Sequence, residues 1–147
     1  TQPSGLTATI SKANLAVSGI AAANKTYNAT TGATQSGAAS VTALGGDIVS
    51  VAGTGTGSFA DANAASNKAV SVTGYTLTGA DAGNYDVVQP NAVRATINKA
   101  DVIVAGSKTY DGTTSVAGST LTATGVAGQQ FSVTGAGDAS NLSSKNV

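Results

Sequence analysis

The sequence predicts an all-β or mostly β protein made of tandem small antiparallel β modules. Three observations support this fold class. Short segments alternate apolar and polar residues, turn-forming Gly, Asn and Asp separate them at regular intervals, and no window repeats apolar residues at helical spacing. We expect each module to be sandwich-like. A β-grasp-like sheet with one short helical turn in the Ala-rich stretch 59–69 is the alternative.

One stretch occurs twice and sets the predicted domain organisation. Residues 8–31 recur at 95–114, with four residues fewer in the second copy. Counted from Gln2 to its counterpart Gln89, the repeat is about 87 residues long, which disfavours a parallel β-helix with coils of about 20 residues. We predict three parts: residues 1–12 as the closing strand of an upstream repeat, 13–98 as a complete β repeat, and 99–147 as a partial second repeat.

The individual strands follow from runs of β-branched and apolar residues. They are predicted at 7–10, 15–17, 40–44, 48–51, 70–73, 75–78, 85–88, 93–97 and 102–104. Turns are predicted at 45–47, at 81–84 and at Asp111-Gly112, with Asn28-Ala29 as a weaker version of the last. Few residues separate the closing strand of one unit from the first strand of the next, so we expect consecutive units to be held end to end.

Composition excludes several classes of function. The net charge is zero and only 10% of the residues are charged, so the chain has no basic surface for nucleic acid. No run of 18 apolar residues predicts a membrane span. His, Cys and Glu are all absent, which leaves Asp, Lys and Tyr for any acid–base chemistry. We therefore expect no enzyme activity and assign no catalytic or cofactor-binding residue.

One acidic turn is a weak candidate for a metal site. Asp81, Asn84 and Asp86 offer oxygen ligands of the kind that calcium prefers, but their spacing is not that of an EF-hand and no Glu is present. The favoured interpretation is structural. Asp81, Gly83 and Asn84 form an Asx-type turn and Tyr85 packs in the core, so no cofactor is expected.

Two tyrosines follow a Lys-Thr pair at equivalent positions of the repeat. Tyr27 and Tyr110 are expected to fill the core, with each hydroxyl bonded to the backbone and the neighbouring lysine in water. The alternative is that the Lys-Thr-Tyr stretch marks a binding face.

Three motifs in order carry a resemblance to a known family. They are Lys-Thr-Tyr-Asp-Gly-Thr-Thr at 108–114, Leu-Thr-Gly-Ala-Asp-Ala-Gly-Asn-Tyr at 77–85, and Ala-Thr-Ile-x-Lys-Ala before the next unit. Together they resemble the YDG-type (MBG-like) repeat of filamentous-haemagglutinin-like bacterial adhesins. Tyr110, Asp111 and Gly112 match the signature, whereas the first copy departs from it with Asn28 and Ala29 after Tyr27.

The resemblance implies a secreted module displayed on a bacterial cell surface, without enzyme activity. It also implies export of the parent protein through an outer-membrane partner, as in two-partner secretion. We expect a structural stalk or spacer repeat of an adhesin, which contacts neighbouring repeats and reaches a host-cell or biofilm surface through the parent protein. The alternative is an adhesive binding module that recognises a glycan, a matrix component or another copy of itself.

The predicted strand at 7–10 has a consequence for association. A strand without a sheet presents unpaired backbone groups and adds readily to other edges. We expect this segment to associate by strand exchange, either adding to a neighbouring chain or completing the second repeat of another molecule.

Overall fold

The computed structural model describes residues 5–113, 116–117, 121–133 and 136–137. It is an all-β structure, as predicted. The strands and short 3-10 turns of the first unit, residues 13–98, are β1 (Ala13–Ala16), β2 (Ser18–Ala22), β3 (Lys25–Thr26), β4 (Gly32–Ala33), β5 (Gln35–Ser40), β6 (Ser50–Ala52), β7 (Thr56–Phe59), β8 (Ala65–Thr73), β9 (Thr76–Thr78), η1 (Ala82–Asn84), β10 (Tyr85–Val88) and β11 (Arg94–Asn98).

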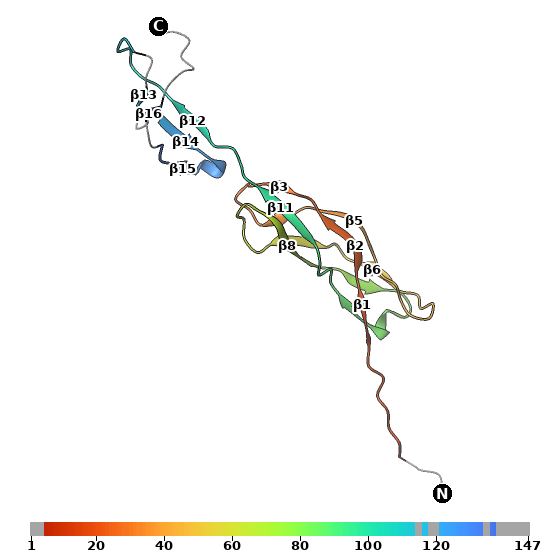
Figure 1. Cartoon of the computed structure of the whole chain (residues 1–147). Coiled ribbons are helices and arrows are strands. Elements are labelled where there is room, and N and C mark those ends of the chain that lie inside the picture. Colours follow the sequence, from red (N-terminus) through yellow and green to blue (C-terminus); the bar gives the residue numbers. More distant parts are fainter. Residues whose placement is uncertain (1–4, 114–115, 118–120, 134–135, 138–147) are drawn as a thin grey trace.

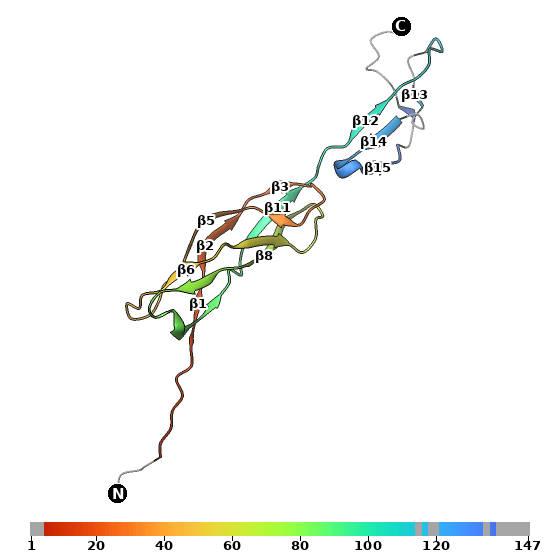
Figure 2. The same cartoon turned by 180° about the vertical axis from the view of Figure 1, so that it is seen from behind.

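The stretch after β11 is called the second unit below, and the structure describes part of it. Its elements are β12 (Ile103–Gly106), β13 (Val116–Ala117), β14 (Leu121–Thr124), η3 (Val126–Gly128), β15 (Gln130–Phe131) and β16 (Ala136–Gly137). Figure 1 and the reverse view in Figure 2 show the two units following one another along a single elongated axis. Residues 99–102 join β11 to β12. None of the helical segments among the described residues is long and apolar enough to cross a membrane.

The largest sheet of the first unit has five strands in the order β3-β11-β8-β7-β4. Three of its pairings are antiparallel, but β11 runs parallel to β3, and β1 also runs parallel to β10. The predicted antiparallel pairing therefore holds for most strand pairs, and these two parallel pairs are the additions to it. Each parallel pair joins strands that are distant in sequence, because parallel neighbours need a long connection between them.

The core of the first unit lies on one face of this five-stranded sheet. Its buried members come from β7, β8, β11 and the residue just before β11, and they are Phe59, Val70, Val72, Val93, Ala95 and Ile97. They recur at every second position because successive strand residues point to opposite faces. Ile20 and Ala22 of β2 pack against them. The unit is thus two layers closed over a small apolar core.

The Ala-rich stretch 59–69 contains no helix. Phe59 ends β7 with its ring in the core, and β8 already begins at Ala65. The bend between them is held by Lys68, whose Nζ donates to the carbonyl oxygens of Asp61 and Asn63. The helical turn of the β-grasp-like alternative is therefore wrong, because residues at both ends of the stretch are needed as core strands.

Two other predicted strands also differ. Residues 41–44 belong to a loop that follows β5, because the backbone N–H of Leu44 bonds to the Tyr85 hydroxyl and not to a neighbouring strand. Residues 7–10 are exposed and form no strand, since no strand of the described chain lies beside them. The turns at 28–29, at 45–47 and at 81–84 lie where they were predicted. The 81–84 turn is not of the expected Asx type, because the Asp81 side chain accepts from the Ile48 N–H and makes no bond to the described residues of the turn.

Candidate functional site

Two matching turns follow the Lys-Thr-Tyr stretches of the repeat, at residues 25–31 in the first unit and 108–113 in the second. We call them the tyrosine turns. In the second turn, Lys108 Nζ donates to the Thr113 carbonyl oxygen at 3.1 Å and lies 2.7 Å from Asp111 Oδ1. The same Asp111 oxygen accepts from the Thr113 N–H at 2.9 Å. One lysine and one carboxylate thus close the turn.

The first turn is built in the same way without the carboxylate. Lys25 Nζ donates to the carbonyl oxygens of Thr30 at 2.7 Å and Gly32 at 2.9 Å, and Asn28 Oδ1 accepts from the Thr30 N–H at 3.2 Å. The ammonium group also lies 5.6 Å from the centre of the Phe59 ring, which adds a cation–π contact. The expectation that these lysines simply face water is therefore wrong.

The residue after the Asn or Asp has a left-handed backbone in both turns. Gly112 has a φ of 78°, and Ala29 has a φ of 60°. Glycine adopts this conformation freely, whereas alanine is strained in it by about 1–2 kcal/mol. The Asp-Gly signature is therefore the relaxed form of the turn, and the first unit carries a strained version of it.

The charge on Asp111 is stabilised by its surroundings. Hydrogen bonds from Lys108 and from Thr113 lower the pKa of its carboxyl group from 3.8 to about 2. Because Asn28 occupies the equivalent position in the first unit, that turn has no titrating group of this kind.

The two tyrosines have different surroundings. Tyr27 is half-buried against the core; its N–H donates to the Asn98 carbonyl at 2.8 Å, and its hydroxyl accepts from Gln129 Nε2 of the second unit at 2.9 Å. Tyr110 is 59% exposed. The expectation of a core tyrosine bonded to the backbone through its hydroxyl fails for Tyr110, and for Tyr27 the hydroxyl partner lies across the joint between units.

The acidic turn fastens two loops of the first unit. Asp81 Oδ2 accepts from the Ile48 N–H at 2.8 Å, while Gly83 and Asn84 lie in η1. Tyr85 is buried, as expected.

The Tyr85 hydroxyl donates to Asp47 at 2.8 Å and accepts from the Leu44 N–H at 3.0 Å. The bond to Asp47 is the main cause of the raised pKa of Tyr85. Asp86, the third calcium candidate, faces Lys12 at 4.0 Å. No three acidic side chains gather into a metal site in the described part of the chain.

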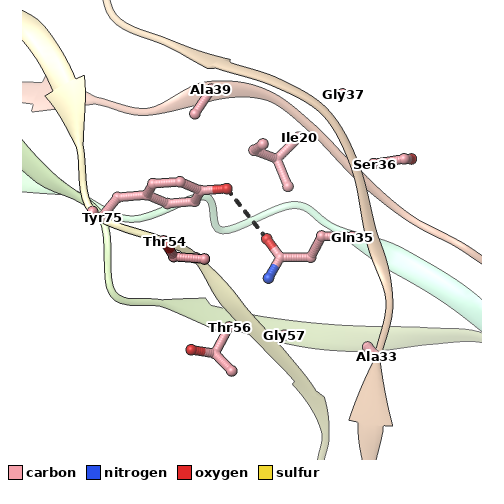
Figure 3. Close-up of a pocket in the computed structure, with 12 residues that line it drawn as sticks. Ile20, Ala33, Gln35, Ser36, Gly37, Ala39, Thr54, Thr56, Gly57 and Tyr75 are labelled. Carbon is pink, nitrogen blue, oxygen red and sulfur yellow. Dashed lines mark hydrogen bonds between the residues drawn. The ribbon is translucent and has the colours of Figure 1, made fainter.

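A hollow of about 480 Å³ opens beside β5 and β7, and the sequence analysis did not predict it. Figure 3 shows the Tyr75 ring on one side, with its hydroxyl 3.4 Å from Gln35 Oε1 and with Ile20 and Thr54 around it. A Cβ on Gly55 would lie 2.4 Å from the ring, so glycine is required beneath it. The run of small residues at 53–57 is a sequence feature that could have indicated this hollow.

The chain matches one protein-family model, the YDG domain, over residues 11–93, which is more than half of its length. Comparison with curated proteins finds no match, and comparison with solved structures finds none either. The matched span covers β1 to β10, and with them the first tyrosine turn, the acidic turn and the loops that Tyr85 fastens. The chain therefore belongs to the YDG domain family.

Proposed function

We propose that this chain is a structural spacer, a stretch of the stalk of a secreted, surface-displayed bacterial adhesin. The observation that carries the proposal is the end-to-end joint between units. β11 leads through residues 99–102 directly into β12, and the Tyr27–Gln129 hydrogen bond ties the two units across that joint. A short connection with a specific contact limits bending, which is what a spacer requires.

The chemistry of the surface also supports a mechanical role. The chain has no His, Cys or Glu, and the described acidic side chains form no cluster. Three lysines, Lys25, Lys68 and Lys108, are engaged in closing turns at residues 25–32, 61–68 and 108–113. On this proposal the chain has no enzyme activity, and the neighbouring repeats are its direct partners.

The hollow beside Tyr75 favours a second candidate function, a binding module. An aromatic ring, the Gln35 amide and the Thr54 hydroxyl are groups that a sugar ring or a short peptide could contact. Against this, the Tyr75 ring packs on Gly55, its backbone bonds to the Gln89 amide, and its hydroxyl contacts Gln35, so the tyrosine already has a structural role.

The two candidates separate in one experiment on cells that display the parent protein. The repeats are replaced by an unrelated β spacer of equal length, and attachment to the target surface is scored. Unchanged attachment is expected for a spacer. Lost attachment, with the distal part still shown on the surface by antibody, would overturn the spacer proposal. A Tyr75→Ala variant that also lost attachment would then place binding in the hollow.

A further inference from the structure

The two parallel strand pairs of the first unit both connect its beginning to its end. β1, its first strand, runs parallel to β10, with Ala13–Ala16 opposite Tyr85–Val88. β3 runs parallel to β11, its last strand, with Lys25 opposite Ile97. The remaining described pairings of this unit are antiparallel. The parallel pairs are therefore the ones that join the strands at the start of the unit to the strands at its end.

Parallel pairing decides how tension acts on the hydrogen bonds. The chain enters the first unit beside β1 at one end and leaves it through β11 at the other (Figure 1, Figure 2). Tension drags β1 backward along its own axis and pulls β10 forward, through residues 89–93 and β11. The pulled ends of a parallel pair lie at opposite ends of its ladder, so all its bonds are stretched together. In a hairpin the pulled ends lie side by side, and the bonds break one after another.

The β1–β10 pair is also anchored by its side chains. The Val17 N–H extends the ladder by donating to the Val88 carbonyl at 2.9 Å. Leu15 and Val17 are each 5% exposed. Across the pair, Tyr85 is buried and its hydroxyl is fixed to Asp47. Sliding β1 along β10 therefore breaks backbone hydrogen bonds and brings buried apolar side chains into water in the same step.

From this topology we infer that the β1–β10 ladder is a shear clamp, the contact that keeps the first unit closed when the chain is stretched from end to end. The β3–β11 pair is a second clamp behind it. Once β1 slides, tension passes through β2 to β3, which again lies parallel to the strand that is being pulled. The Tyr27 N–H, which donates to the Asn98 carbonyl at 2.8 Å, extends this second pair.

The clamp resists force and does not by itself raise the equilibrium stability of the unit. Forced unfolding is governed by the unfolding rate along the pulled direction, whereas melting reports the free energy of the whole fold. The inference deepens the proposed function and rests on it for one point, that a stalk repeat is stretched from its first strand to its last. The response of the chain to pulling is a property of its own topology.

The test pulls the whole chain in two directions. The chain has no cysteine, so two introduced thiols can carry the handles of an optical trap. Ser11→Cys with Lys99→Cys pulls β1 and β10 from opposite ends of their ladder. The matched control, Ser11→Cys with Asn84→Cys, pulls the same two strands from adjacent ends, and all three residues are exposed. The first pair is expected to open at a severalfold higher force, because only it stretches the bonds together. Equal melting temperatures show that both variants are equally folded.

A second comparison separates the clamp from general stability. Leu15→Ala weakens the packing of β1, whereas Phe59→Leu removes packing from β7, which lies outside the two clamps. Both substitutions should lower the melting temperature. Pulled from residues 11 and 99, only Leu15→Ala should open at a clearly lower force.

Two results would overturn the inference. One is an equal opening force in the two pulling directions, and the other is a loss of force in Phe59→Leu as large as in Leu15→Ala. The spacer proposal fails separately. Lost attachment in the replacement experiment would overturn the spacer and leave the two opening forces unequal, whereas equal forces with unchanged attachment would leave a spacer that has no clamp.

Discussion

The segment 6–10 and the segment 93–97 have closely similar sequences and opposite structures. The second is an interior strand of the sheet, hydrogen-bonded on its two sides by β3 and β8, whereas the first is an exposed extension. Strand propensity cannot explain the difference, because the two segments share it. The difference shows that a strand in this repeat is formed by its neighbours, since β preference mostly reflects packing against adjacent strands.

The largest expected effect tests this comparison with one substitution at the two matched positions. Ile97→Ala removes a fully buried side chain from the core and should lower the free energy of unfolding of the first unit by about 2–5 kcal/mol. Ile10→Ala, the same change in the exposed copy, should change it by less than about 0.5 kcal/mol. Urea denaturation followed by circular dichroism measures both. Equal losses would contradict the separate roles of the two segments.

A smaller effect is expected where the two tyrosine turns differ. Ala29→Gly relieves a left-handed backbone strain of about 1–2 kcal/mol. The greater conformational freedom of glycine in the unfolded chain offsets about 0.5–1 kcal/mol of that gain. A net stabilisation of up to about 1.5 kcal/mol should appear as a raised melting temperature of the first unit.

The control for that substitution is Ala60→Gly. Ala60 is an exposed loop residue without a positive φ, so glycine should stabilise nothing there. A destabilised Ala29→Gly variant would show that the alanine methyl group makes a contact that outweighs the strain.

Sequence reasoning located the features that depend on local pattern. Alternation placed Val70 and Val72 on a buried face, and the Asn and Asp residues marked the turns. It failed where the structure of a segment depends on a residue that is distant in the sequence. Residues 60–69 are held by Lys68 and by pairing of β8 with β7 and β11, and the Tyr27 hydroxyl bonds to Gln129, which is 102 residues away. No local signal distinguishes Tyr27 from Tyr110, because their difference arises at the joint.

The joint itself gives a third test. Tyr27→Phe keeps the ring against the core and removes the hydrogen bond to Gln129 Nε2, a contact worth about 0.5–1.5 kcal/mol. The first unit should unfold as before, but the two units should reorient more freely. Residual dipolar couplings measured in both units should no longer fit one common alignment.

Tyr110→Phe is the matched control for the joint. The Tyr110 ring is largely exposed and its hydroxyl makes no hydrogen bond to a described residue, so this variant should keep the common alignment of the intact chain. If both variants behaved like the intact chain, the short connection at 99–102 alone would hold the units in line, and the tyrosine contact would be incidental to rigidity.

The smallest expected effect comes from acid. Asp111 has a folded pKa of about 2, depressed from 3.8 by Lys108 and Thr113, so the stability that its charge contributes is present above pH 3.8 and is lost as the pH falls through about 2. The Thr113 amide resonance should therefore titrate with a midpoint near pH 2. The Thr30 amide, which donates to the uncharged Asn28, should not report such a step.

Two variants sharpen this test. Lys108→Met should move the midpoint of the Thr113 amide titration up toward pH 3.8. Asn28→Asp should create a low midpoint in the first turn, because Lys25 occupies the position equivalent to Lys108. A Thr113 midpoint near 3.8 in the intact chain would mean that the ion pair does not persist in water, and the two turns would then differ only in the strain at Ala29.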